Sequence, residues 1–153
     1  MTDETFAALK PVFQPFVDKL VAEPPALPRE LPKGKGLYAL REKGIWLYVG
    51  ITSNLRQRWQ MHRNGDPSAA SFAVRLARID ADRPRTYKKG DGLKALMASD
   101  DAFRKAFTDA RNRIRGMEIR YVEWPGEDDE LAILEIYAAK ALETGTHNDF
   151  ATH

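Results

Sequence analysis

Residues 36–50 read GLYALREKGIWLYVG, and this stretch decides the fold. It holds two short runs rich in aliphatic and aromatic residues, 36–41 and 45–50, separated by a spacer that ends in Gly44. Runs of this kind are typical of β-strands. A glycine also suits the left-handed position of a three-residue hairpin loop. The stretch therefore predicts a β-hairpin whose loop is formed by residues 42–44.

The predicted pairing of the two strands brings two tyrosines together. With residues 42–44 as the loop, Arg41 pairs with Ile45, and Tyr38 then lies directly opposite Tyr48. Side chains opposite one another in an antiparallel pair share one face, with their Cβ atoms roughly 5 Å apart. Two phenols in this position can hydrogen-bond to a common water. A plain cross-strand aromatic pair is the structural alternative, and the pair alone favours that alternative.

The rest of the chain is predicted to be mainly helical. Apolar residues recur at intervals of three and four in several segments, whereas residues 117–124 alternate and predict a third strand. The strands and an apolar helix need a common core, so we expect an α+β fold. It would be a small three-stranded sheet flanked by helices, with an N-terminal helical extension. The expected helices cover residues 3–22, 54–64, 69–79, 93–113 with a break near Ser99, and 128–142.

The first 33 residues are predicted to form the helical extension and a proline-rich linker, and residues 34–153 the main domain. Pro11 and Pro15 lie inside the helical pattern, which predicts a kink or two short helices. The apolar stripe of the extension is expected to pack against the domain or a second subunit, because exposed aromatic side chains on an isolated helix are a liability. That stripe consists of Phe6, Phe13, Phe16 and Leu20.

Composition excludes several classes of protein. The chain has 153 residues, 30% of them charged, and no cysteine. Disulfides, thiolate metal sites and cysteine nucleophiles are therefore ruled out. No apolar run approaches the length that spans a membrane, and the acidic start differs from the basic-then-apolar order of a signal peptide. We expect a soluble, globular, cytoplasmic protein without a membrane partner, and the sequence does not indicate its oligomeric state.

The net charge of +2 conceals an uneven distribution. Residues 1–94 hold 17 Lys and Arg against 10 Asp and Glu, whereas residues 95–153 hold 7 against 12. A basic face beside an acidic end is compatible with a polyanion-binding protein that carries a metal-binding carboxylate. Solvated surface charge explains the same distribution, and the distribution alone favours that explanation.

Two polar residues follow the hairpin on a predicted helix. Arg58 and His62 are four residues apart and therefore share one helix face. A guanidinium can bind two phosphate oxygens at once and stays charged, and a nearby histidine can donate or relay a proton. Taken in isolation, the two residues are better explained as a surface pair.

Glu135 lies in the apolar stripe of the last predicted helix. Its neighbours on the helix face are Leu131, Ala138, Ala139 and Leu142. An unpaired buried charge is costly, so a carboxylate in this position is usually paired or bound to a metal. The pattern leaves metal ligation and a structural salt bridge to an arginine equally open.

The ordered set of these positions resembles the GIY-YIG nuclease family, in particular its small single-domain members of bacterial type. Each tripeptide alone is a weak signal, but order and spacing together are specific. Tyr38 and Tyr48 are ten residues apart, and Tyr48 lies ten residues before Arg58. The matching positions are Gly36-Leu37-Tyr38, Tyr48-Val49-Gly50, Asn54-Leu55, Arg58, His62 and Leu134-Glu135.

The resemblance spans residue 34 to the C-terminus, and the ending, residues 148–153, is similar to that of some bacterial members. It does not cover the N-terminal extension. Leu37 and Val49 stand where the namesake motifs have isoleucine, which keeps an apolar side chain. Residues 80–115 look like an insertion into a short core, so the packing and the substrate of the middle segment stay open.

The resemblance implies a metal-dependent endonuclease, a hydrolase of phosphodiester bonds that binds nucleic acid, with DNA favoured over RNA. Glu135 would hold one Mg²⁺, or Mn²⁺ in its place. Arg58 would bind the substrate and stabilise charge on the phosphoryl oxygens. Tyr38 or Tyr48 would take a proton from the attacking water, and His62 would accept it onward.

Asn148 is implied to hold substrate or to orient the site, with a loop-capping asparagine as the structural alternative. A rival reading is a GIY-YIG-like module that binds nucleic acid or a protein without cutting, although all five polar positions are filled. A third reading treats the basic surface as incidental. The sequence does not indicate which tyrosine is the base, what structure the substrate has, or which pathway uses it.

Overall fold

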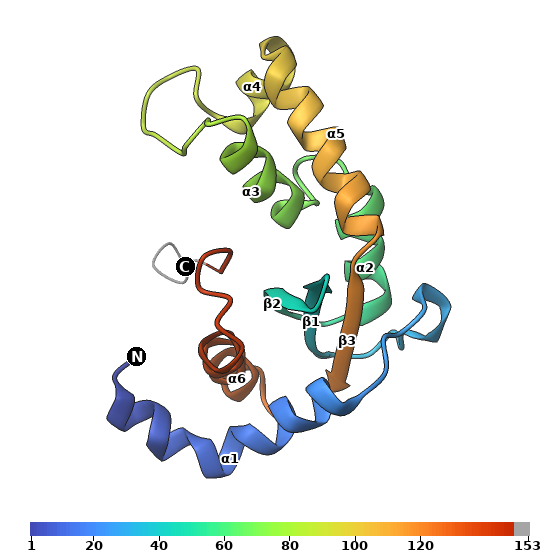
Figure 1. The fold of residues 1–153 in the computed structure, drawn as a ribbon, viewed down its shortest axis with the longest axis vertical. Helices are drawn as coiled ribbons and strands as arrows, with labels where there is room; N and C mark the ends of the chain where they lie inside the picture. Colours follow the sequence, from blue (N-terminus) through green and yellow to red (C-terminus); the bar gives the residue numbers. More distant parts are fainter. Residues whose placement is uncertain (149–153) are drawn as a thin grey trace. The chain divides into compact units, whose positions relative to one another are not determined.

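The computed structural model of the chain describes residues 1–148 and confirms the predicted α+β class (Figure 1). Within these residues no helix is long and apolar enough to cross a membrane. The elements are α1 (Asp3–Ala22), the short 3₁₀ helix η1 (Pro28–Glu30), β1 (Gly36–Glu42), β2 (Ile45–Thr52), α2 (Leu55–Asn64), α3 (Ser71–Asp80), α4 (Leu93–Ser99), α5 (Asp101–Arg115), β3 (Glu118–Glu123) and α6 (Asp128–Ala141).

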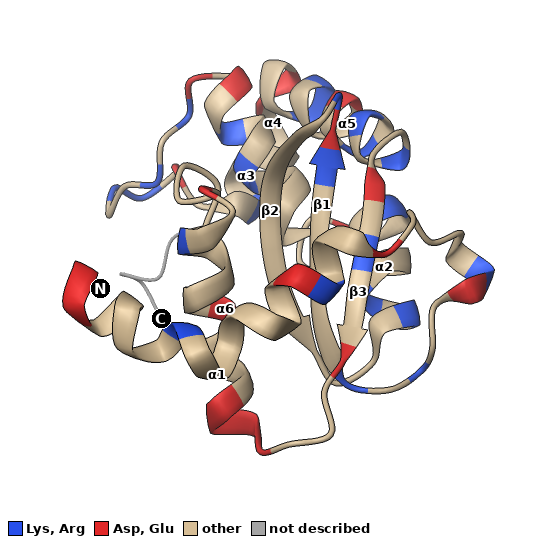
Figure 2. Ribbon diagram, turned by 60° about the horizontal axis from the view of Figure 1, so that its bottom comes forward, with Lys and Arg blue, Asp and Glu red and all other residues tan. Residues whose placement is uncertain are grey.

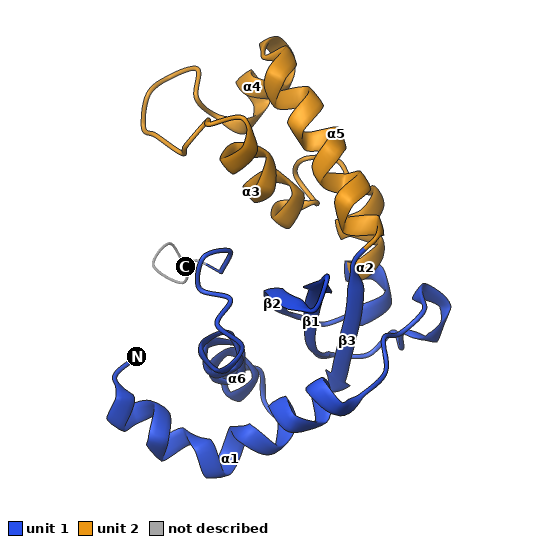
Figure 3. Ribbon diagram, viewed as in Figure 1, with its two compact units in different colours: residues 1–58, 117–153 blue, residues 59–116 orange. Residues whose placement is uncertain are grey.

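The described chain divides by packing into two compact units (Figure 3). Unit 1 contains residues 1–58 and the described residues from 117 onward, with α1, the sheet and α6. Unit 2 contains residues 59–116, with α3, α4 and α5. The continuous helix α2 begins in unit 1 and ends in unit 2. The division at residue 33 that the sequence suggests stays a prediction.

The sheet of unit 1 has the strand order β2-β1-β3, and both pairings are antiparallel. The central strand is therefore β1, whose residues 36–40 are all buried. Its first glycine permits a close contact with β3, since a Cβ on Gly36 would lie 2.3 Å from the carbonyl oxygen of Val122. Alternate side chains of β1 point to opposite faces of the sheet.

The β1–β2 hairpin differs from the predicted one in its loop. Glu42 pairs with Ile45, so the turn has two residues, Lys43 and Gly44, instead of the predicted three. Both have positive φ angles, 51° and 80°. These angles fit a type I′ turn, whose twist matches that of the flanking strands.

The register of the hairpin also changes along its length. A β-bulge leaves Leu47 as an extra residue of β2, so that Tyr48 pairs with Leu40 and Tyr38 pairs with Gly50. The prediction that the two tyrosines lie directly opposite each other is therefore wrong. They do share one face of the sheet, because Tyr48 and Gly50 are two residues apart in β2. Tyr48 is the diagonal neighbour of Tyr38.

The opposite face of the sheet forms the core of unit 1 together with α1 and α6 (Figure 1). Phe6 stacks on Tyr137 with ring centroids 4.6 Å apart, and Phe16 meets Trp124 edge-on at 5.0 Å. The predicted packing of the N-terminal stripe against the domain is thereby confirmed. The buried residues are Phe13, Val17, Leu20, Leu37, Ala39, Val49, Val122, Trp124, Leu131, Leu134, Tyr137, Ala138 and Ala139.

The helix α1 is continuous, so the alternative of two short helices is wrong. A proline inside a helix costs about 3 kcal/mol or more, because it removes one hydrogen bond and crowds the preceding turn. Pro11 and Pro15 are both exposed and four residues apart. They therefore lie on the side of α1 where water can satisfy the freed carbonyl groups. Burial of the opposite side against the core keeps the helix in one piece.

Unit 2 is helical and has a core of its own, formed mainly between α3 and α5. The side chain of Asp100 caps α5 by accepting a hydrogen bond from the backbone N–H of Phe103 at 3.0 Å. This cap separates α4 from α5 and confirms the predicted break near Ser99. The buried residues of the three helices are Phe72, Ala73, Leu76, Ala77, Leu96, Phe103, Ala106, Phe107, Ala110 and Ile114.

Candidate active site

Tyr38 lies in the middle of the central strand, and its side chain is only 1% exposed. The ring passes over β2 at Gly50, where a Cβ would lie 2.3 Å from the phenol oxygen and 2.4 Å from Cζ. A side chain at residue 50 would force the Tyr38 ring to shift, and a glycine in a strand is typical of such close approach. The glycine of the second tripeptide therefore determines where the phenol of the first one lies.

Tyr48 supplies the second phenol on the same face. Its ring centroid lies 6.3 Å from that of Tyr38, with the ring planes tilted by 42°. Tyr48 is half-buried, whereas Tyr38 is enclosed. The two phenols are close, as predicted, but only one of them is accessible to solvent and to a substrate.

The start of α2 is fixed by contacts that precede the helix. The Asn54 side chain accepts a hydrogen bond from the backbone N–H of Gln57 at 3.1 Å and so caps the helix. The backbone N–H of Leu55 donates to the carbonyl of Gly34 at 3.0 Å, and the Leu55 side chain is buried. These contacts place Arg58 beside the face of the sheet that carries the tyrosines.

The Arg58 guanidinium donates hydrogen bonds to the phenol oxygens of both Tyr38 and Tyr48. Three side chains from β1, β2 and α2 thus form one connected cluster in unit 1. A guanidinium has five N–H donors in a fixed plane. A guanidinium can therefore bind several acceptors in one plane, as the two phenol oxygens show.

The cluster changes the proton affinities of its members. Burial raises the pKa of Tyr38 well above its ordinary value, and the charges of Tyr48 and Glu135 raise it further, while Arg58 opposes the shift. Burial lowers the pKa of Arg58, but the charges and hydrogen bonds of the two tyrosines outweigh it, and the net direction is upward. At neutral pH Tyr38 is therefore protonated and Arg58 is charged.

Glu135 reaches the cluster from α6, far along the chain. The helix packs against β1 and β2, and the side chain of Glu135 is half-buried beside the buried Leu134 and Ala138. Its carboxylate is close enough to Tyr38 to raise the pKa of that phenol. Unit 1 therefore brings a carboxylate, two phenols and a guanidinium together, whereas the convergence of all five residues, His62 included, on one cleft stays a prediction.

His62 lies one turn after Arg58 on α2 and is fully buried. Within unit 2 its ring meets Phe72 edge-on, with ring centroids 6.4 Å apart. A buried imidazole is usually hydrogen-bonded, whether it serves packing or chemistry. The predicted part of His62 in proton transfer stays a prediction.

Asn148 connects the chain after α6 to the edge of β2. Its side-chain oxygen accepts hydrogen bonds from the Val49 N–H at 3.0 Å and from the Thr144 hydroxyl at 2.7 Å. Its side-chain nitrogen donates to the Val49 carbonyl at 2.7 Å. The amide thus pairs with β2 as a neighbouring strand would, between Tyr48 and Gly50. This arrangement suits an orienting role, while a direct contact with substrate stays a prediction.

Two supporting residues were not predicted from the sequence as parts of the site. Gly50 could have been found, because a glycine inside a strand often marks close approach of another group. Thr144 has no comparable signal, since it lies in a polar, turn-like ending. Only the fold shows that it is buried and that its hydroxyl donates to Asn148.

A divalent metal at this site would have Glu135 as its protein ligand. Residues 1–148 contain no group of three or more His, Asp or Glu side chains that could hold a metal. Mg²⁺ keeps several of its waters and is bound through one or two carboxylates and substrate oxygens. A half-buried carboxylate close to Tyr38 fits that requirement.

Comparison with known proteins gives one finding about this chain. A family model described as the GIY-YIG catalytic domain matches residues 34–148, which is most of the sequence. Comparisons with curated proteins and with solved structures gave no significant match. The matched range contains the whole cluster of unit 1 described above, and it also contains Asn148.

Proposed function

Because this chain belongs to the GIY-YIG catalytic-domain family, a nuclease-type family, we propose that it is a metal-dependent endonuclease. The reaction is hydrolysis of a phosphodiester bond in nucleic acid, with DNA preferred to RNA. The observation that supports this proposal best is the cluster in which Arg58 binds both Tyr38 and Tyr48, with Glu135 close to Tyr38.

Arg58 is proposed to bind the scissile phosphate. Its guanidinium is held in place by the two phenols before substrate arrives. A donor fixed in advance needs no reorganisation when negative charge grows on the phosphoryl oxygens. Arg58 therefore contributes both to binding of the phosphate and to stabilisation of the transition state.

Tyr48 is proposed as the general base. Its half-buried phenol is accessible to water, and in the phenolate form it would accept a proton from the attacking water. The water oxygen then bonds to phosphorus while the bond from phosphorus to the leaving oxygen breaks, and the leaving oxygen takes a proton from solvent. Arg58, which donates a hydrogen bond to Tyr48, favours the phenolate.

Tyr38 is proposed to act differently from Tyr48. Its enclosed position raises its pKa, so it keeps its proton at neutral pH. Its oxygen accepts a hydrogen bond from Arg58, while its own O–H can donate to a water or a phosphate oxygen. We therefore assign it the role of positioning Arg58 and the attacking water.

Glu135 is proposed to hold Mg²⁺, with Mn²⁺ as a substitute. When bound, the metal would polarise the phosphate and stabilise charge on the leaving oxygen. The carboxylate fits this role because it is half-buried and close enough to Tyr38 to act on its phenol.

The alternative proposal is a GIY-YIG-like module that binds nucleic acid or a protein without cutting. The preformed contacts of Arg58 with both tyrosines favour the enzyme, because a binding surface has no need to hold a guanidinium against one enclosed and one accessible phenol. A protein that retains DNA or RNA but cuts neither would instead support the binding module.

The test is a cleavage assay with the full chain. Supercoiled plasmid, branched DNA and RNA are incubated with Mg²⁺, with Mn²⁺ and with chelator. The proposal predicts nicking or cutting of DNA that depends on metal, stops with chelator and exceeds cleavage of RNA. Binding without cleavage under every metal condition would replace the nuclease by the binding module, and preference for RNA would correct the substrate.

A further inference from the structure

The loop between α3 and α4 has an unusual composition. Residues 81–92 read ADRPRTYKKGDG, with four basic residues and two acidic residues. Figure 2 shows Lys and Arg along this loop of unit 2. The loop is part of the middle segment that resembles an insertion, and none of its residues belongs to the cluster in unit 1.

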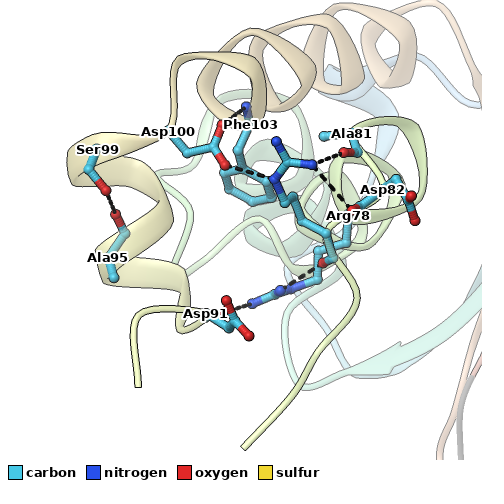
Figure 4. Close-up of polar contacts among 9 residues, drawn as sticks. Arg78, Ala81, Asp82, Asp91, Ala95, Ser99, Asp100 and Phe103 are labelled. Carbon is cyan, nitrogen blue, oxygen red and sulfur yellow. Dashed lines mark hydrogen bonds and ion pairs between the residues drawn. The ribbon is translucent and has the colours of Figure 1, made fainter. Parts of the chain in front are cut away.

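The base of the loop is held by two arginines that point inward. Arg83 pairs with Asp100, Nε to Oδ2 at 2.8 Å, and donates to the Ala81 carbonyl at 2.7 Å. Arg78 donates to the carbonyls of Arg83 at 3.0 Å and Asp91 at 3.4 Å. Figure 4 shows the contacts made by Asp100, Ala81 and Asp91. Both ends of the loop are therefore fixed to α3 and α5.

The middle of the loop points the other way. Arg85, Tyr87, Lys88 and Lys89 are all exposed, and the Tyr87 side chain is 110% exposed, which means that nothing covers its ring. Across residues 1–148 no side chain forms an ion pair or hydrogen bond with these four side chains. Of the two acidic residues of the loop, Asp91 accepts a hydrogen bond from the Thr86 hydroxyl, and the charge of Asp82 acts on Arg83.

The acidic residues of the loop do not form ion pairs with the exposed cations Arg85, Lys88 and Lys89. Burial and the neighbouring charge of Arg85 lower the pKa of Arg78, so the basic residues oppose one another's charged forms. The three exposed cations and the exposed Tyr87 ring thus lie on a loop whose two ends are fixed by Arg78 and Arg83. A polyanion that also offers a flat ring would satisfy both features at once.

We propose that the middle of this loop, residues 85–89, binds a single-stranded stretch of nucleic acid. Arg85, Lys88 and Lys89 contact phosphates, and Tyr87 stacks on an unpaired base. Stacking on aromatic side chains combined with a basic groove is how proteins bind single strands without sequence preference. In a duplex the base faces are covered by their neighbours, so Tyr87 would have no partner there. The inference rests on the proposed function, because it specifies where that nucleic acid binds.

The test measures binding by the full chain in the presence of chelator, which prevents cleavage. Fluorescence anisotropy is recorded with an oligothymidine single strand and with a duplex of equal length. Tyr87→Ala should weaken single-strand binding by about five-fold or more, the lower end of the range for one base stacked on an aromatic side chain. Tyr87→Phe should bind like the wild type, because the ring is retained, and duplex binding should change little.

The cations are tested by the salt dependence of single-strand binding. Replacing Lys88 and Lys89 by Gln should reduce the slope of log affinity against log salt by about 1.4, since each phosphate contact on a single strand contributes about 0.7. Replacing Lys10 and Lys19, two exposed lysines of α1, by Gln is the matched control and should leave the slope unchanged.

Equal single-strand binding by wild type and Tyr87→Ala would overturn the inference, as would equal slopes for the loop and control variants. Retention of the wild type, but not of the loop variants, by anionic phospholipid vesicles with unchanged nucleic-acid binding would assign the loop to membranes instead. Different results would contradict the proposed nuclease function and the inference about the loop. If binding depends on the loop but no metal-dependent cleavage occurs, the nuclease proposal is contradicted. If the loop variants bind and cut like the wild type, only the inference about the loop is contradicted.

Discussion

Each unit has a tyrosine close to basic side chains, but the tyrosine of unit 1 is buried and that of unit 2 is exposed. In unit 1, Tyr38 is 1% exposed, and its phenol is bound to Arg58. In unit 2, Tyr87 is fully exposed, and the cations around it are solvated. A buried polar group left without its partner costs about 1–3 kcal/mol, whereas an exposed one loses little. We therefore expect substitutions around Tyr38 to affect cleavage and stability. Substitutions around Tyr87 should affect only the affinity for nucleic acid.

The largest difference is expected between the two tyrosines of unit 1. Tyr48→Phe should reduce the cleavage rate by about 10²–10⁴-fold, the usual contribution of a general base. The rate increase toward alkaline pH should also disappear, because no phenolate can form. Tyr38→Phe should cost less and keep that pH dependence. The measurement is kcat/KM against pH for both variants, and a larger loss in Tyr38→Phe would exchange the assigned roles.

Replacement of Arg58 should have the next largest effect. Arg58→Ala should lower kcat by about 10²–10³-fold, as for removal of one charge-stabilising donor. Arg58→Lys should rescue little, because an ammonium lacks the planar fork that binds two partners. Arg29→Ala, which removes an exposed arginine of unit 1, is the control and should cut like the wild type. Equal activity of Arg58→Ala and Arg29→Ala would contradict the phosphate role.

Gly50→Ala tests how the fold places the first phenol. A Cβ at this position would collide with the Tyr38 ring, and overpacking of a well-packed site costs about 1–3 kcal/mol. We expect a lower melting temperature together with a loss of cleavage. Gly92→Ala is the matched control, since a Cβ there meets nothing within 4 Å and its φ is −69°. If both variants melt and cut alike, Tyr38 does not depend on Gly50.

A smaller effect on activity is expected at Asn148. Asn148→Ala leaves the N–H and C=O of Val49 without their side-chain partners, and each buried unpaired group costs about 1–3 kcal/mol. Denaturant unfolding should therefore show reduced stability. Cleavage below the melting temperature should fall less than in Arg58→Ala, because Asn148 positions the edge of β2. A kcat loss as large as that of Arg58→Ala, with stability unchanged, would instead favour direct contact with substrate.

Much of the fold could be predicted from local patterns, and the errors have local causes. Alternation and helical spacing identified the strands and helices, and the order of five polar positions indicated the family. The bulge at Leu47 could not be predicted, because an apolar run gives no sign of which residue lacks a partner. The continuity of α1 through Pro11 and Pro15 depends on packing against α6, which no local pattern reports.

The candidate site shows the same limit. Sequence spacing placed the two tyrosines on one face and Arg58 on the following helix. It did not show that one phenol is enclosed and the other accessible, although that difference determines their roles. The contacts of Asn148 with Val49 likewise arise only when the chain after α6 returns to β2.

The most direct test of the account compares Glu135→Gln with Glu130→Gln. Both residues lie on α6, but Glu130 is exposed in the first turn, whereas Glu135 is half-buried and close enough to Tyr38 to act on its phenol. Plasmid cleavage is measured with Mg²⁺, and DNA binding with chelator. The account predicts that Glu135→Gln binds DNA like the wild type but does not cut, while Glu130→Gln does both. Undiminished cleavage by Glu135→Gln would contradict the assignment of Glu135 as the metal ligand at the centre of this site.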